Sequence, residues 1–137
     1  MRRIGTRPLG VVLTLMLAGC TTGTTSFVEL REQPIDAVRH VAGADYRALA
    51  ECITKGGEDQ TTASIGERWS VRDEPAERRA RIMVAGTAGN ALMELVVVQV
   101  GDDVLVESRR VAALVTPVLE RRAFALIEPC QQSQGTP

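Results

Sequence analysis

Aromatic residues and histidine are scarce in this chain of 137 residues, and their scarcity argues against several kinds of site. Phe, Trp and Tyr together make up 3% of the sequence, and His40 is the single histidine. Aromatic side chains dominate the energetic centres of protein interfaces, so their low number argues against an aromatic-rich interface or ligand pocket. A lone histidine on a predicted surface helix, beside Arg39, is ordinarily a solvated side chain and not a general base.

Residue clusters that carry chemistry are missing from the sequence as well. No spacing of histidine and cysteine suits a metal ion. Ser64 and Ser70 have no nucleophile motif and no paired base, and Gly86 and Gly89 lack the lysine of a phosphate-binding loop. The adjacent acids Glu58-Asp59 lie in a predicted loop, where carboxylates are ordinarily solvated. We therefore expect no catalysis, no metal and no cofactor.

No apolar run reaches the ~20 residues that cross a bilayer as a helix, but a shorter one lies near the start of the chain. Its surroundings follow the order of a secretory signal: a basic start, an apolar centre and small residues before a cleavage site. These parts are Arg2, Arg3 and Arg7, then residues 9–17, then Ala18, Gly19 and Cys20. A transmembrane anchor and an ordinary secreted protein are the alternatives; the length disfavours the first, and a cysteine at the cleavage site disfavours the second.

The residues Leu17-Ala18-Gly19-Cys20 resemble the lipobox of bacterial lipoproteins. The resemblance implies cleavage between Gly19 and Cys20, a diacylglyceryl group on the cysteine sulfur, and three acyl chains on the processed protein. Two or more chains hold a protein firmly to a membrane. Asp after the cysteine would resemble an inner-membrane retention signal, so Thr21 favours the outer membrane. We therefore expect a lipid-anchored protein of the bacterial envelope that faces the periplasm.

The other two cysteines are Cys52 and Cys130. If Cys20 is lipidated, they form the one pair left in an oxidising compartment, and a disulfide is the natural interpretation. Two separate buried thiols are the alternative. A bridge that closes so long a loop could stabilise a small domain by roughly 4 kcal/mol.

The chain after the signal suffices for one domain, and its composition sets the boundaries. Residues 1–19 are the predicted signal peptide, 20–33 a lipidated flexible tether, 34–131 a single periplasm-facing domain, and 132–137 a polar tail. Removal of the signal arginines makes the formal net charge more negative than the -1 of the whole chain. Nucleic-acid binding needs a basic patch, so we expect no nucleic acid as a partner.

Periodicity predicts a first helix after Pro34, where apolar residues recur at steps of three and four. Gly56 and Gly57 are expected to end this helix. Gly43 could kink it or split it into two pieces, the second capped by Asp45.

Four segments with alternating apolar residues then predict strands. Their ranges are 64–72, 79–85, 91–100 and 103–111. A second helix is expected from Thr116-Pro117 to about Pro129. The predicted fold is therefore α+β: a helix, a four-stranded antiparallel meander and a helix, with both helices on one face of the sheet and joined by the disulfide. This layout, with an early cysteine, a Trp-bearing strand and a late helical cysteine, resembles that of small bacterial envelope lipoproteins; the resemblance implies no biochemical activity.

The predicted strand at residues 91–100 is apolar on both faces. One face of this strand must point to the helices and the other away from them. If Met93, Leu95 and Val97 face the helices, then the residues that point away are Leu92, Val96, Val98 and Val100. The opposite arrangement is the alternative. Either loops and arginine side chains cover the face that points away, or it is a contact surface for a partner or a second copy, so that a homodimer is possible.

These observations favour an envelope protein that acts through protein–protein contacts, as an assembly accessory or an inhibitor-like binder. The alternative is a binder of a small apolar or envelope-derived ligand between the helices and the sheet. A pocket above ~300 Å³ with a few convergent polar groups would favour the alternative, and a flat apolar sheet face would favour protein contacts.

Overall fold

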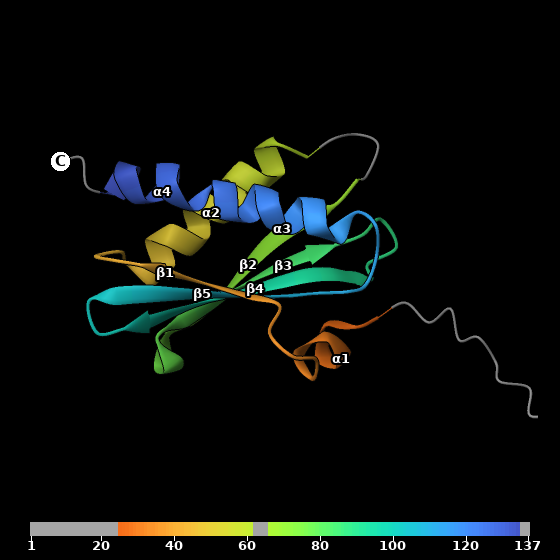
Figure 1. Cartoon of the computed structure of the whole chain (residues 1–137), viewed down its shortest axis with the longest axis horizontal. Coiled ribbons are helices and arrows are strands. Elements are labelled where there is room, and N and C mark those ends of the chain that lie inside the picture. Colours follow the sequence, from red (N-terminus) through yellow and green to blue (C-terminus); the bar gives the residue numbers. More distant parts are fainter. Residues whose placement is uncertain (1–24, 62–65, 135–137) are drawn as a thin grey trace, which may run out of the picture.

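The computed structural model describes residues 25–61 and 66–134, which form one α+β fold (Figure 1). An antiparallel sheet with the strand order β1-β5-β4-β3-β2 carries three helices on one face and a short helix on the other. The elements are α1 (Phe27–Arg31), β1 (Ala37–Val41), α2 (Tyr46–Asp59), β2 (Arg68–Glu74), the 3-10 turn η1 (Pro75–Glu77), β3 (Arg79–Ala85), β4 (Ala91–Val100), β5 (Asp103–Arg110), α3 (Thr116–Ala125) and α4 (Ile127–Gln134). We call the face under α2, α3 and α4 the core face and the opposite one the α1 face.

The central strands lie where alternation of apolar residues predicted them. β3 and β4 have the predicted bounds, and β5 ends one residue early. Ala80, Ile82 and Val84 are at most 1% exposed and lie on the core face. Leu95 pairs with Ile82, so the odd-numbered residues of β4 also point to the helices. β2 runs from Arg68 to Glu74 instead of 64–72; residues 64 and 65 lie outside the described residues.

The helix predicted after Pro34 is wrong in its first half. The segment 37–41 forms β1 and pairs with β5, so the sheet has five strands and is not a four-stranded meander. Ile35 and Val38, which the helical pattern placed on a buried face, are 41% and 56% exposed. A turn at Gly43, with φ +66°, follows β1. Asp45 then caps α2 as predicted.

Gly56 and Gly57 do not end α2, which continues to Asp59. A Cβ atom on Gly57 would lie 2.3 Å from the ring of Trp69, and one on Gly56 would lie 2.8 Å from a methyl group of Leu126. The two glycines therefore allow β2 and the α3–α4 junction to approach the helix closely. That close packing offsets the cost of roughly 1 kcal/mol for glycine inside a helix.

The C-terminal helix is divided into α3 and α4, which meet at Leu126. Pro129 lies in the first turn of α4, where its missing N–H costs no hydrogen bond, so the helix does not end there. The predicted polar tail, 132–137, therefore starts inside α4, and residues 135–137 lie outside the described residues.

The predicted tether, residues 20–33, is structured in its second half. Ser26 and Glu29 form a capping box at the start of α1, and Leu30 of this helix is fully buried. The Ala91 N–H at the start of β4 donates to the Thr25 carbonyl (2.8 Å). Thr25 is therefore already part of the fold, and residues 20–24 lie outside the described residues.

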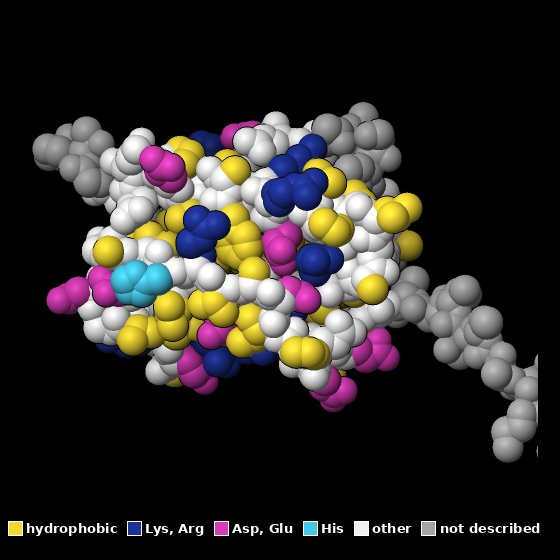
Figure 2. All heavy atoms as spheres, in the orientation of Figure 1, with side chains coloured by type: hydrophobic (Ala, Val, Ile, Leu, Met, Phe, Trp, Pro, Cys, Tyr) yellow, Lys and Arg dark blue, Asp and Glu magenta, His cyan; other side chains and the backbone are white. Residues whose placement is uncertain are grey.

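The main core lies between the core face and helices α2, α3 and α4. Its fully buried side chains include Leu49, Ile53, Leu95 and Leu119. In the orientation of Figure 1, Figure 2 shows apolar side chains that reach the surface between these helices and the β1 edge. Within the described ranges, no helix is both long and apolar enough to cross a membrane.

Candidate functional site

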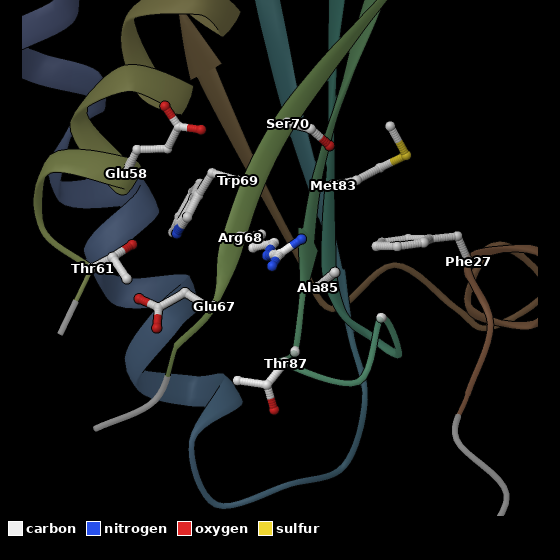
Figure 3. Close-up of a pocket in the computed structure, with 12 residues that line it drawn as sticks. Phe27, Glu58, Thr61, Glu67, Arg68, Trp69, Ser70, Met83, Ala85 and Thr87 are labelled. Atoms are coloured by element: carbon white, nitrogen blue, oxygen red, sulfur yellow. The ribbon is translucent and has the colours of Figure 1, made fainter. Parts of the chain in front are cut away.

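A groove of about 660 Å³ lies at the start of β2, an edge strand of the sheet (Figure 3). We call it the β2 groove. It is lined by Phe27, Glu58, Thr61, Glu67, Arg68, Trp69, Ser70, Met83, Ala85, Gly86, Thr87 and Gly89. Three of these, Arg68, Trp69 and Ser70, are consecutive in β2. Because successive side chains of a strand point to opposite faces, the groove reaches both faces of this edge.

The α1 face of the groove holds an apolar cluster beside the side chains of Arg68 and Ser70. Met83 and Ala85 of β3 lie on the same side of the sheet as Phe27 of α1 (Figure 3). They pair with Ser70 and Arg68 across the β2–β3 ladder. β2 forms this one ladder, and in the described part of the chain its other backbone edge makes no backbone hydrogen bond.

The core face of the groove carries acidic groups around the indole of Trp69. Glu58 is exposed at the end of α2, whereas Glu67 is only 3% exposed. Arg122 Nη1 donates to Glu67 Oε1 (3.2 Å). Glu67 Oε2 and Trp69 Nε1 are buried without a hydrogen-bond partner. A buried polar group left unpaired costs about 1–3 kcal/mol, so a ligand that paired with either atom would recover part of that cost.

A second hollow, of about 650 Å³, lies between β1 and helices α3 and α4 and is called the β1 hollow. The guanidinium of Arg39 already lies over the Phe124 ring, 5.4 Å from its centroid. His40 Nε2 lies 3.0 Å from Asp103 Oδ2 at the sheet edge. Charged and amide side chains, including Arg121 and Glu128, make up much of the remaining lining. The aromatic face in this hollow is therefore occupied by the protein's own arginine.

The predicted contact residues of β4 are placed in different surroundings. Leu92 is 8% exposed and belongs to the main core, beside a shift in the β3–β4 register. Val96 lies on the α1 face and is 5% exposed. Val98 is half-buried there, and Val100 is 53% exposed. Only Val98 and Val100 of this set are therefore accessible to a partner.

A ladder of charges fills the α1 face beside α1. Glu94 is 1% exposed, and it accepts hydrogen bonds from Arg31 Nη2 and Arg81 Nη1, each at 2.9 Å. Arg81 Nε and Arg79 Nε both donate to Glu74 Oε1 at 2.8 Å. The hydrogen bond with Glu94 is the main cause that raises the pKa of Arg31. Arginine side chains and α1 thus cover much of the face that β4 presents away from the core.

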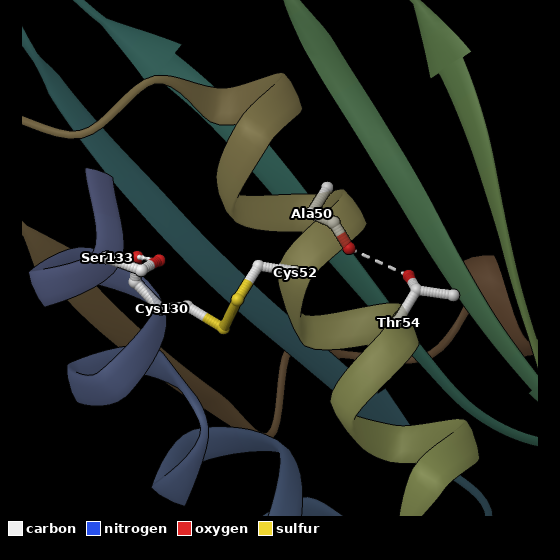
Figure 4. Close-up of a disulfide and its surroundings, with 5 residues drawn as sticks. All are labelled: Ala50, Cys52, Thr54, Cys130 and Ser133. Atoms are coloured by element: carbon white, nitrogen blue, oxygen red, sulfur yellow. Dashed lines mark hydrogen bonds between the residues drawn. A yellow bond between two sulfur atoms is a disulfide. The ribbon is translucent and has the colours of Figure 1, made fainter. Parts of the chain in front are cut away.

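The predicted disulfide between Cys52 and Cys130 is confirmed (Figure 4). The bridge joins α2 to α4, with the two Cα atoms 5.7 Å apart. It packs against the main core, in which Cys130 is 3% exposed. The predicted cleavage and lipidation residues, Gly19 and Cys20, lie outside the described residues.

The sequence analysis gave neither Glu67 nor Trp69 a role in a site, although both line the β2 groove, and Trp69 also belongs to the main core. The signal was present: Glu67 is a carboxylate in a strand-like run whose neighbours on the same face, Ile65, Trp69 and Val71, are apolar. Phe27 and Met83 carried no such signal, because only the position of α1 brings them together.

Comparison with known proteins adds no assignment. No family model, curated protein or solved structure matches this chain. Among residues 25–61 and 66–134, no group of three or more His, Cys, Asp or Glu side chains could hold a metal ion. Any functional assignment therefore rests on the residues and geometry described above.

Proposed function

We propose that this chain is a lipid-anchored protein of the bacterial envelope that acts by binding a protein partner, without catalysis. The β2 groove carries this proposal. It combines an open strand edge, whose backbone donors and acceptors can pair with another chain, with side chains on both faces of that edge. A compact ligand would use one face of the strand, whereas an extended chain can use both.

The distance between the predicted anchor and the groove supports a partner at the membrane. The chain from Cys20 to Thr25 spans at most roughly 18 Å when fully extended. Thr25 is bound to Ala91, next to the 86–89 loop that borders the groove. A lipid on Cys20 would therefore hold the groove close to the bilayer surface.

The second candidate function is the binding of a small apolar or envelope-derived ligand in the same groove. Its volume of about 660 Å³ lies in the range of small-molecule sites, ≈ 300–1,000 Å³. Glu67 Oε2 and Trp69 Nε1 are two unpaired polar atoms that could orient such a ligand.

Site-specific photo-crosslinking in the native envelope tests the two candidates. A photoreactive residue replaces Ser70 in the groove, Val98 on the α1 face, or Glu51, an exposed control residue on α2. We expect the residue at Ser70 to capture one defined protein, and the residue at Glu51 to capture none. A small-molecule adduct at Ser70 would favour the second candidate. Capture from Val98 alone would place the contact surface on the sheet face.

The anchor is tested separately by Cys20→Ser. This variant should remain as an unprocessed or mislocalised precursor, because the sulfur that accepts the lipid is gone. Membrane fractionation and the intact mass of the purified chain measure the effect. An unchanged mass and an unchanged membrane fraction would contradict the lipid anchor.

A further inference from the structure

We infer that the β2 groove binds an extended segment of the partner protein, which adds to the open edge of β2 as a further strand and carries alternating apolar and basic side chains. The inference rests on the proposed function and gives the partner a chemistry. Three features of the groove carry it: the unpaired backbone edge, the apolar cluster on the α1 face, and the exposed Glu58 and unpaired Glu67 Oε2 on the core face.

The backbone edge is the first feature. β2 is hydrogen-bonded to β3 on one side, and its other side makes no backbone hydrogen bond in the described part of the chain. Strand addition to such an edge supplies affinity through main-chain hydrogen bonds, and pockets for alternate side chains supply specificity. Arg68, Trp69 and Ser70 place this edge directly in the groove.

The apolar cluster on the α1 face determines the chemistry of every second residue of the added strand. Every second residue of an added strand points to the α1 face, where Phe27, Met83 and Ala85 lie together. Ala85 and Met83 occupy the β3 positions next to Arg68 and Ser70 of β2. Apolar side chains of moderate size, such as valine, would bury surface there.

The carboxylates on the core face determine the chemistry of the intervening residues of the added strand. The intervening residues of the added strand point to the core face, toward Glu58 and Glu67. Glu58 is exposed, and Glu67 Oε2 is buried without a partner. Glu67 Oε1 already accepts from Arg122, so a lysine or arginine side chain of the added strand would pair with Glu58 or with the free Oε2 atom of Glu67. Trp69 Nε1, also unpaired, can donate to an acceptor of the added chain.

The other sheet edge does not offer the same combination. β1 is shorter than β2. At its C-terminal end Gln131 of α4 donates to the Ala42 carbonyl (2.7 Å). Arg39 occupies the aromatic face of the β1 hollow. A second copy of this chain, paired antiparallel through β2, would place its own Arg68 and Arg72 on the α1 face beside Arg68 and Arg72 of the first copy, so like charges oppose that occupant.

A peptide titration tests the inference on the full chain, purified from the envelope and held in phosphatidylcholine vesicles. The probe is an octapeptide of alternating lysine and valine with blocked ends. Trp69 is the sole tryptophan of the chain, so its emission reports directly on the groove. We expect a saturable change in emission. Methylation of alternate peptide amides, or glutamate in place of lysine, should weaken binding about tenfold or more.

Two variants separate the groove from the overall acidity of the protein. Glu58→Lys changes a carboxylate of the groove, and Glu51→Lys makes the same charge change at an exposed position of α2 that does not line it. Only Glu58→Lys should weaken binding of the lysine peptide. On peptide binding, hydrogen exchange should slow at the amides of residues 68–74 and stay unchanged at residues 37–41.

Several outcomes would overturn the inference. One is that the methylated peptide binds as tightly as the unmethylated one, and another is that Glu58→Lys and Glu51→Lys change binding equally. The others are that the peptide slows hydrogen exchange in β1 and not in β2, or that the emission of Trp69 shows no saturable response. A saturable response to decanoate without one to the peptide would assign the groove to a small ligand, and peptide-independent dimerisation through β2 would assign it to a second copy. If peptide binding fails while the photoreactive residue at Ser70 still captures a protein, the proposed function stands and strand addition is wrong.

Discussion

The two faces of the sheet are covered by different means. On the core face, three helices and a disulfide enclose a continuous apolar core. On the α1 face, one short helix buries Leu30, and beside it a ladder of arginine and glutamate side chains occupies the surface. Apolar packing tolerates no charge and little loss of volume, whereas a ladder of charges tolerates substitution at its rim and responds to pH. The same strand, β4, contributes to both.

The sharpest test of this difference is the pair Val97→Glu and Val98→Glu. Val97 is fully buried on the core face, where an unpaired carboxylate costs several kcal/mol, and this variant should lose its cooperative thermal transition. Val98 is half-buried on the α1 face opposite Arg79, which can pair with the new carboxylate, so its Tm should shift by only a few degrees. Circular dichroism melts measure both. Unfolding of both variants would mean that the α1 face is as closed as the core face.

The disulfide is expected to give the next largest effect. Cys130→Ala removes the bridge between α2 and α4 and should lower the free energy of unfolding by roughly 2–5 kcal/mol in urea titrations. Ser133→Ala, in the same helix, removes only a hydrogen bond to the Cys130 carbonyl and serves as the control. Equal losses in the two variants would show that the bridge contributes little.

Loss of the buried carboxylate on the α1 face should be milder. Glu94→Gln removes the negative charge shared by Arg31 and Arg81 and replaces one of the two acceptor oxygens by an NH2 donor, and we expect a loss of about 1–3 kcal/mol. Glu107→Gln is the matched control, since Glu107 is half-buried on the same face and has no ion pair within the described residues. Urea unfolding that does not distinguish the two variants would remove the ladder as a source of stability.

The smallest effect is the dependence on pH. Burial opposes ionisation of Glu74, but hydrogen bonds from Arg79 and Arg81 outweigh it and hold the pKa of its carboxyl below the usual range. Its contribution, about 1 kcal/mol or less, is present above the pKa of the unfolded chain and is lost as pH falls through the folded pKa. Glu74→Gln should therefore flatten the acid limb of stability measured between neutral pH and about pH 3. An unchanged acid limb would contradict this assignment.

The sequence predicted best the elements whose residues carry their own signal. The alternation of apolar residues in the ranges 79–85, 91–100 and 103–111 placed β3, β4 and β5 within a residue. β1 could not be predicted in the same way, because its stability comes from pairing with β5, more than sixty positions later in the chain, and not from a buried face of its own. The spacing of the apolar residues around Val38 is equally compatible with a helix when the pairing with β5 is not considered.

Gly56 and Gly57 show a second limit. Two adjacent glycines ordinarily end a helix, yet here the space they leave is filled by Trp69 and Leu126 from distant elements. The candidate site also depends on contacts between distant elements. Glu67 and Trp69 could be singled out from their strand pattern, whereas the α1 face of the groove depends on where α1 docks. That docking depends on Leu30, which is fully buried, and on Arg31, whose hydrogen-bond partners lie on β4 and β3.

The hydrogen bond between Thr25 and Ala91 has a mechanical consequence. A pull on the N-terminal segment enters the fold at β4, the central strand, which is tied by full ladders to β3 and β5. The load is therefore divided between two neighbours before it reaches either edge. β2, the last strand in the order, is reached only through β3, so a chain bound at its open edge, as proposed above, would be separated from tension on the proposed anchor by one full ladder.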